Sequence, residues 1–292
     1  MMSIFSALVI AALISQQVTG SFWNAYKKSN PEEFSGQYDG DILLPKGFGF
    51  RNAGLYARKW PNGIVPYETE EVGALLRNRI DRALRWLEDV VGRDCIRFVP
   101  RTNERNYVKV FSGSGCYSSV GMKGGAQKLS LNRLGCFEHS TIQHEFLHAL
   151  GFWHEQMRQD RDKYLQINWD NIKEDMKYNF NKITTNDLNT PYYYGSIMHY
   201  GSFTFSKNLR KTMQPKNLET KIGVRRIVKE NSWDAKRVRL FYGCDPPLKY
   251  CKDDYPMCKT VDRSDCIFNH EITSKCRKTC GVCILNEENV KP

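Results

Sequence analysis

The sequence predicts an α+β domain with two lobes, followed by a small module held together by cysteines. Strand-like runs and one long amphipathic helix come first in the domain, and irregular chain dominates its second half. Six of the ten cysteines are then packed between Cys251 and Cys283. A chain of 292 residues, 41% of them hydrophobic, is long enough to build a real core.

The individual elements follow from apolar periodicity. Helical spacing predicts helices over 75–91, 141–150, 172–180 and 232–242. Alternating or short apolar runs predict strands over 64–67, 96–99, 107–111 and 129–132. An extended polar segment over 21–51 precedes the domain, and Asp245-Pro246-Pro247 marks its end. We therefore divide the chain into 1–20, 21–51, 52–245 and 246–292.

The first twenty residues indicate export. They carry no charged side chain, residues 4–14 are almost continuously apolar, and the small residues Val18, Thr19 and Gly20 follow. This run is short for a bilayer span and has the length of a secretory signal peptide. A buried N-terminal helix or a membrane anchor is the alternative. No later stretch is apolar for long enough to span a membrane, so we expect a secreted, extracellular protein.

The cysteines agree with an oxidising compartment. An even count with a dense cluster at one end is typical of a disulfide framework. A zinc-finger cluster is the cytosolic alternative. It is disfavoured because Cys280-Gly-Val-Cys283 is the only CxxC pair and no second pair faces it.

The positive charge is concentrated in the middle of the chain. The formal net charge is +11, residues 21–51 carry four side chains of each sign, and residues 246–292 carry eight positive and seven negative ones. A basic domain favours acidic substrates or matrix polyanions, and a solvated basic surface is the simpler explanation. No basic stripe interleaved with aromatic residues occurs, so we expect no nucleic-acid partner.

The strongest functional pattern is HEFLHALGFWH over 144–154. On a helix, His144 and His148 are one turn apart on the same face and can share one ion. Gly151 tolerates the left-handed backbone that ends a helix, which would let His154 return as a third ligand. Three histidines with an open fourth position predict one catalytic Zn²⁺.

The chemistry follows from that geometry. Zinc lowers the pKa of a bound water to about 7 and polarises a carbonyl. Glu145 lies next to the first histidine, where it can act as the general base for peptide hydrolysis. The added glycine and third histidine extend HExxH to the longer metzincin signature, and Met198 in SIMHY supplies the Met-turn.

The run HEFLHALGFWHEQMRQDRDKY over 144–164, together with SIMHY, resembles the signature of the astacin family of zinc metalloendopeptidases. The resemblance covers 52–245 and implies a two-lobed metzincin fold with the active-site helix between the lobes. It implies the following roles: zinc ligands His144, His148 and His154; general base Glu145; switchable zinc ligand and oxyanion donor Tyr200; hydrophobic base beneath the metal Met198; partner of the mature amino terminus Glu155. Arg158, Asp160, Arg161 and Asp162 resemble a structural charge network, with a solvated surface as the alternative for at least one of them.

The resemblance also implies a zymogen. Astacin precursors carry a Phe-x-Gly-Asp motif, and Tyr38-Asp39-Gly40-Asp41 is the nearest match, which makes Asp41 the expected zinc-blocking carboxylate. An ordinary turn aspartate is the alternative. We expect a trypsin-like protease to cut after Arg51. In the segment Ile222-Gly223-Val224-Arg225, Arg225 resembles the basic residue that selects an acidic side chain just after the cleaved bond.

Cysteine pairing is also implied by resemblance. In the astacin-like domain the pairs are Cys95–Cys244 and Cys116–Cys136. The tail, which ends in CRKTCGVC, resembles the six-cysteine ShKT module, with pairs Cys251–Cys283, Cys258–Cys276 and Cys266–Cys280; the residues alone allow fifteen pairings. The Lys-Tyr pair of the channel-blocking toxins is missing between the third and fourth cysteines. We therefore expect a docking role rather than channel block.

Two other functional classes compete with a secreted endopeptidase acting on proteins or peptides. A binding or toxin-like protein led by the cysteine-rich tail is disfavoured by the intact histidines and Glu145. A non-proteolytic zinc hydrolase or structural zinc protein is disfavoured by Asp41 and Tyr200, which both indicate peptide hydrolysis.

Overall fold

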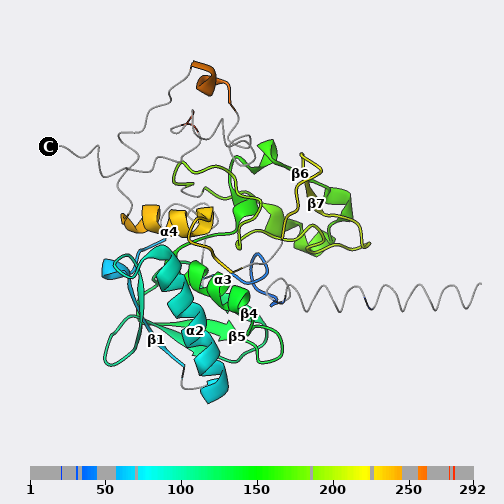
Figure 1. Cartoon of the computed structure of the whole chain (residues 1–292). Coiled ribbons are helices and arrows are strands. Elements are labelled where there is room, and N and C mark those ends of the chain that lie inside the picture. The colour runs from blue at the N-terminus through cyan, green and yellow to red at the C-terminus, as the bar shows by residue number, and fades with distance from the viewer. Residues whose placement is uncertain are drawn as a thin grey trace, which may run out of the picture.

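A computed structural model describes residues 35–44, 57–69, 72–184, 187–223 and 227–244, together with 21, 31, 256–261, 276 and 279. The predicted signal peptide, the cleavage site at Arg51, Arg225 and most of the cysteine-rich tail lie outside these residues. The described chain forms two large hydrophobic cores. Helix α3 (His139–Leu150) lies between the elements that build them (Figure 1).

The first core is built on a five-stranded sheet. Its strands are β1 (Ile64–Glu68), β2 (Arg97–Pro100), β3 (Tyr107–Phe111), β4 (Cys116–Ser118) and β5 (Ala126–Leu131). They lie in the order β2-β1-β3-β5-β4, and the first four run parallel. β4 is antiparallel to β5 and forms one edge of the sheet. This mostly parallel sheet with covering helices refines the predicted α+β class.

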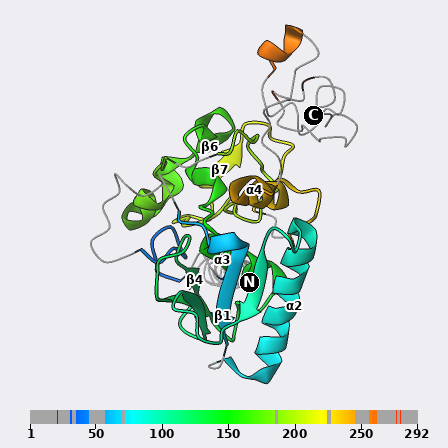
Figure 2. The same ribbon diagram turned by 90° about the vertical axis from the view of Figure 1, so that its left-hand side faces the viewer.

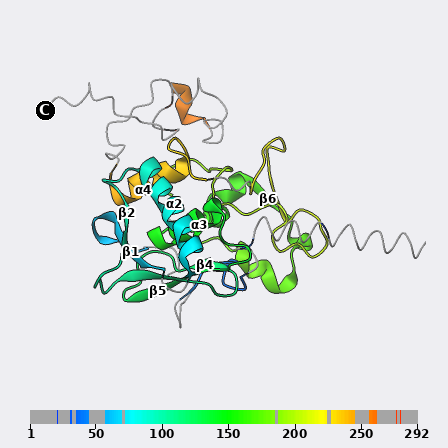
Figure 3. The same ribbon diagram turned by 60° about the horizontal axis from the view of Figure 1, so that its bottom comes forward.

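Helices α2 and α3 cover one face of this sheet (Figure 3). Helix α2 (Ala74–Val91) buries Ile80, Leu84 and Leu87, whose spacing of four and three residues forms one apolar stripe. This stripe packs against α3 and β2. In α3 every residue from Thr141 to Leu150 is buried, so the helix is enclosed on all sides. Helix α4 (Trp233–Tyr242) begins after Ser232, whose hydroxyl caps it, and packs against α2.

The second core is rich in aromatic side chains. It gathers Tyr164, Tyr192, Tyr194, Phe180 and Phe205 around a two-stranded antiparallel sheet of β6 (Leu165–Ile167) and β7 (Met213–Pro215). The view in Figure 2 separates these elements from the five-stranded sheet. Regular structure is sparse here, so large side chains rather than long elements fill the interior.

The helix expected over 172–180 takes a different form. The chain there forms a 3₁₀ helix over Glu174–Phe180. Ile172 and Phe180 are buried, whereas Glu174 and Asp175 between them are exposed. The buried apolar residues lie at the two ends of this segment rather than along one stripe. Packing therefore does not favour an α-helix over the 3₁₀ helix.

The segment before the domain lies against the edge of the sheet. Residues 37–42 form a tight turn, and Ile42 pairs in parallel with Ser118 of β4. The amide of Leu43 donates to the Ser118 carbonyl at 2.8 Å, and the Ser118 amide donates to the Asp41 carbonyl at 2.9 Å. The segment 35–44 therefore pairs with β4 through a single β-bridge.

Three disulfides lie among the described residues. They join Cys95 to Cys244, Cys116 to Cys136 and Cys258 to Cys276. The first closes 149 residues of chain and links the start of β2 to the residues after α4. Among the described helices, none combines the length and the apolar character that a bilayer crossing requires.

Candidate zinc site

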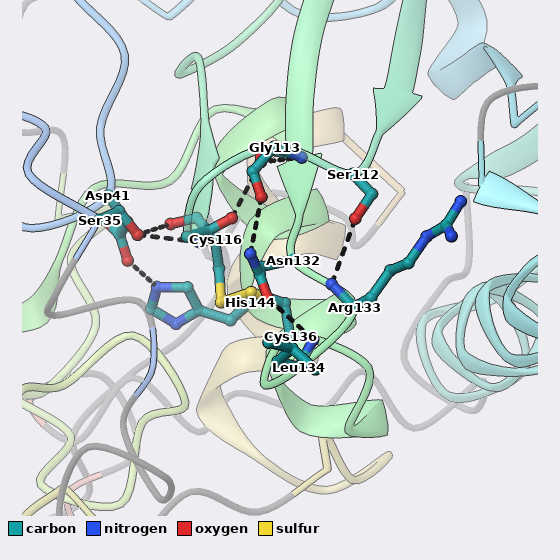
Figure 4. The surroundings of a disulfide bond; sticks show 12 residues. Ser35, Asp41, Ser112, Gly113, Cys116, Asn132, Arg133, Leu134, Cys136 and His144 are labelled. Carbon is teal, nitrogen blue, oxygen red and sulfur yellow. Dashed lines mark hydrogen bonds and ion pairs between the residues drawn. A yellow bond between two sulfur atoms is a disulfide. The ribbon is translucent and has the colours of Figure 1, made fainter.

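Four buried side chains converge beside α3. One ligand atom from each of His144, His148, His154 and Asp41 lies within 4.8 Å of the others. The Nε2 atom of His144 is 2.9 Å from one Asp41 oxygen, and the Nε2 atoms of His148 and His154 are each 3.3 Å from the other. The three imidazoles therefore face one carboxylate, as Figure 4 shows for His144.

Local structure explains the convergence. His144 and His148 are one turn apart on α3 and share a face. Gly151 ends the helix with φ of 121°, a backbone conformation that favours glycine, and its amide donates to the carbonyls of Leu147 and His148. A Cβ at this position would lie 2.9 Å from the Phe241 ring, so the turn has no room for a side chain. The chain then returns with His154 facing the helix.

The second nitrogen of each imidazole also has a partner. Nδ1 of His144 lies 2.8 Å from the Ile197 carbonyl oxygen, and Nδ1 of His148 lies 2.7 Å from that of Phe152. A carbonyl only accepts, so Nδ1 of both rings carries a proton, which leaves Nε2 as the nitrogen that could bind a metal. Nδ1 of His154 lies 2.6 Å from an oxygen of Asp39. This arrangement is typical of histidines that bind a metal through Nε2.

The cluster favours a positive charge at its centre. The Nε2 atoms of His144 and His154 are 3.2 Å apart, close to the edge of about 3.4 Å expected for two nitrogens bound to one tetrahedral zinc. Burial opposes ionisation of Asp41, but His154 and His148 hold the pKa of its carboxyl well below its usual range. Burial likewise opposes a charged His154, yet Asp41 and Asp39 raise its pKa to about 10. One Zn²⁺ among these imidazoles would supply the positive charge that the carboxylates favour.

The other predicted catalytic residues lie around the cluster. Glu145 is fully buried on α3 directly after His144. The Tyr200 ring lies 4.8 Å from the His154 ring between centroids, and its hydroxyl donates to Asp39 at 2.5 Å. Met198 is buried in the first core, and its carbonyl accepts from the Glu155 amide at 2.8 Å.

Asp234 supports the turn that carries Met198. One of its oxygens accepts from the Ser196 hydroxyl at 2.5 Å, and the other accepts from the Ile197 amide at 3.0 Å. Burial raises the pKa of Asp234 to about 6 against these two hydrogen bonds. Sequence reasoning missed this residue, and its position in the first turn of α4 offers no distinctive signal.

Glu155 lies at the centre of a buried ion-pair network. Its carboxylate contacts both terminal nitrogens of Arg237, accepts from the Tyr193 amide at 2.7 Å and lies 3.5 Å from Arg158. Burial opposes the charge, but Arg237 and Arg158 lower the pKa of Glu155. A cavity of about 360 Å³ adjoins the carboxylate, and it is lined by Ala57, Gly151, Trp153, Asp234 and Arg237 among others. The sequence alone does not predict a role for Arg237. It lies within the helix expected over 232–242, and nothing in that pattern indicates its contact with Glu155.

The predicted charge network is partly buried. Arg158 forms two hydrogen bonds of 2.9 Å with the Asp160 carboxylate, and its guanidinium also donates to two backbone carbonyls. Arg161 is buried and donates to the Gln156 carbonyl, whereas the Asp162 side chain is 57% exposed and pairs with Lys182 and Arg161. Asp162 therefore belongs to the solvated surface.

The Cys116–Cys136 disulfide lies near the cluster (Figure 4). The Ser35 hydroxyl donates to the Cys116 carbonyl and accepts from the Cys116 amide, at 2.5 and 2.8 Å. On the other side, Asn132 donates to the Gly113 carbonyl at 2.8 Å. The disulfide thus fastens β4, which carries the segment with Asp41, to the chain that leads into α3.

Three imidazoles suited to one zinc ion, with a buried glutamate directly after the first of them, are the constellation of a zinc-dependent hydrolase. Comparison with known proteins specifies the family. The sequence profile described as Astacin (Peptidase family M12A) matches residues 53–243. The chain therefore belongs to the astacin family and is a zinc metalloendopeptidase.

Individual relatives agree. High choriolytic enzyme 2 of Oryzias latipes is 54% identical over 222 residues, which cover 70% of this chain and 75% of the relative. High choriolytic enzyme 1 of the same fish is 45% identical over 218 residues, covering 70% and 77%. The solved structure of High choriolytic enzyme 1, described as a hatching enzyme zinc-protease, gives a TM-score of 0.59 at 47% identity and covers 64% of this chain and 94% of that one.

Proposed function

We propose that this protein is a secreted endopeptidase that is made as a latent precursor and activated by removal of residues 21–51. The observation that carries the proposal is the position of Asp41, whose carboxylate faces all three histidine Nε2 atoms. A carboxylate there would occupy the fourth position that a water needs for hydrolysis. The disulfides support export.

The reaction is hydrolysis of a peptide bond. When bound by His144, His148 and His154, zinc would polarise the scissile carbonyl and lower the pKa of the attacking water. Glu145 would take a proton from that water and return it to the departing amine. Tyr200, once its hydroxyl is released from Asp39, would donate a hydrogen bond to the developing oxyanion.

The edge of β4 is the natural place for an extended peptide. Edge strands present unpaired amides and carbonyls that bind chains by strand addition. In the latent protein, the segment 35–44 pairs with this edge through Leu43 and Ser118. This contact would exclude substrate from the edge while Asp41 blocks the metal.

The activity test compares the full chain with protein cut after Arg51. Peptide cleavage is measured with and without a zinc chelator, beside a processed Glu145→Gln variant of equal zinc content. Chelator-sensitive cleavage by the processed wild type alone would support both the enzyme and its latency. Equal cleavage by the uncut chain would overturn latency, and no cleavage by a folded, zinc-loaded processed sample would overturn the peptidase proposal.

Activation would place a new amino terminus, at Asn52 or Ala53, near Glu155. The cavity beside this buried carboxylate supports the proposal, and Arg237 and Arg158 would share the carboxylate with the incoming ammonium group. Sequencing the mature N-terminus tests the cleavage site. A start far from residue 52 would reject it, and Glu155→Gln should weaken processed enzyme more than it alters the folding of the full chain.

Substrate preference would come from Arg225. The net positive charge of the domain supports a preference for an acidic residue just after the scissile bond. The resemblance of residues 222–225 to the astacin-family segment that carries a basic residue supports the same preference. Cleavage of a peptide library by Arg225→Ala should lose the acidic preference, whereas the neighbouring Arg226→Ala should retain it. An unchanged profile for Arg225→Ala would reject this assignment. Because the relatives above are named choriolytic enzymes, extracellular coat proteins are a substrate class to include.

The tail over 246–292 is proposed to be a ShKT module that docks the enzyme. The bond between Cys258 and Cys276 supports this pairing pattern, and the other two expected pairs lie outside the described residues. Mass spectrometry of unreduced peptides would test it. Any connectivity other than Cys251–Cys283 and Cys266–Cys280 would reject the module.

A further inference from the structure

Asp39 is a second carboxylate in the segment that carries Asp41. It is fully buried, and both of its oxygens contact the site: one accepts from the Tyr200 hydroxyl at 2.5 Å, and the other lies 2.6 Å from Nδ1 of His154. Its own amide donates to the Asn179 side chain at 2.8 Å, which fixes the turn. Asn179 and Tyr200 lie 140 and 161 positions from Asp39 in the sequence, so these contacts form only in the folded chain.

The Nδ1 partner of His154 comes from a different part of the chain than the Nδ1 partners of His144 and His148. Nδ1 of His144 and of His148 contacts a backbone carbonyl of the domain itself, and these partners remain after cleavage at Arg51. The partner of His154 comes from the segment that cleavage would remove. A carboxylate at the outer nitrogen orients a metal-binding imidazole and makes it a stronger ligand, and loss of such a partner typically lowers metal affinity about 10- to 100-fold.

We propose that Asp39 is the outer partner of the third zinc ligand in the uncut chain and also engages the Tyr200 hydroxyl. This inference rests on the proposed latency. It gives the two aspartates separate tasks: Asp41 occupies the open zinc position, and Asp39 strengthens zinc binding through His154 while restraining Tyr200. Cleavage would then free Tyr200 and weaken the hold on zinc in a single event.

A carboxylate suits this position. With the Tyr200 hydroxyl and the Nδ1 proton of His154 as donors, both aspartate oxygens accept, whereas an asparagine offers one accepting oxygen and one NH₂ group. Asp39 has φ of 44°, a left-handed conformation that asparagine and aspartate tolerate better than most residues. Asp39→Asn therefore changes one hydrogen-bonding group without imposing a new backbone conformation.

The test measures zinc release from the uncut, zinc-loaded chain to a chromophoric chelator. Asp39→Asn should accelerate release about 10- to 100-fold relative to wild type. Asp162→Asn is the matched control, because the Asp162 carboxylate pairs with Lys182 and Arg161 and with none of the three histidines, and its release rate should equal that of wild type. After cleavage at Arg51, the Asp39→Asn and wild-type enzymes are the same chain, so equal zinc release and equal kcat/KM would show that the domain folded correctly.

The outcomes separate the two proposals. A latent wild-type chain whose zinc release is unchanged by Asp39→Asn would overturn the role of Asp39 and leave latency intact. An uncut wild-type chain as active as the processed enzyme would overturn latency itself. Accelerated release confined to the uncut Asp39→Asn chain, followed by identical processed enzymes, would support the inference.

Discussion

Nδ1 of His144 lies 2.8 Å from the carbonyl oxygen of Ile197, so the first histidine of α3 is tied to the turn before Met198. The amide of the same Ile197 donates to Asp234 in α4. A single residue therefore connects the helix of the zinc site to the last helix of the domain, and the protonation of Asp234 bears on both.

Asp234 should make folding stability depend on pH. Burial raises its pKa from 3.8 to about 6, so the native state keeps a proton between about pH 4 and 6 that the unfolded state has lost. The stabilisation that protonated Asp234 gives the native state is therefore fully present below about pH 4 and is lost as the pH rises through about 6. The stability of wild type relative to Asp234→Asn should fall by about 2 kcal/mol between pH 4.5 and 6.5.

Urea unfolding of both uncut proteins at the two pH values checks this prediction. Acidic groups such as Glu155, whose pKa is lowered, impose the opposite slope, but they are common to both proteins and cancel in the difference. If the free energy of unfolding of wild type minus that of Asp234→Asn stays constant, or grows with pH, the raised pKa of Asp234 is contradicted.

Replacing Glu145 by glutamine should remove catalysis and leave zinc bound. The amide cannot accept the proton, and loss of a general base typically costs about 10²- to 10⁴-fold in rate. We expect this drop in kcat/KM for the processed enzyme at unchanged zinc content. Residual activity near the wild-type value would show that another group takes the proton.

Tyr200→Phe should lower kcat with little change in KM. The ring packs among Phe180, Phe205 and His154, so phenylalanine keeps the packing and removes only the hydroxyl. Loss of one oxyanion donor costs about 10²- to 10³-fold in kcat. An effect confined to KM would instead point to a role in substrate binding.

The two disulfides of the catalytic domain should differ in their contribution to stability. Cys95–Cys244 closes 149 residues and Cys116–Cys136 closes 20, which corresponds to about 5 and about 3 kcal/mol in the chain-entropy model. Denaturant unfolding of the paired alanine variants under non-reducing conditions measures both. The reverse order would show that local packing around Cys116 outweighs chain entropy.

Much of the first core could be predicted from sequence. The stripe Ile80, Leu84 and Leu87 fixes helix α2, and the alternation over Tyr107–Phe111 matches β3. The strands β4, β6 and β7 were missed because each has three residues and owes its conformation to a neighbouring strand rather than to its own pattern. The helix expected over 172–180 was wrong in type for a similar reason, since its apolar residues do not share one face.

The site shows the same division. The ligand motif is local, so helix geometry alone predicts that His144 and His148 face one ion. Asp39, Asp234 and Arg237 reach the site only because distant segments meet, and no spacing in the sequence reports such contacts. Residues that act through tertiary contacts therefore become visible only once the fold is known.

The pairing of Ile42 with Ser118 also affects how concentrated the protein can be. An uncovered edge strand is a template for pairing with another chain, and the exposed β4 edges of two molecules can pair with each other. The uncut chain carries its own cover for that edge. Protein that has lost residues 35–44 should therefore self-associate at a lower concentration than the uncut chain.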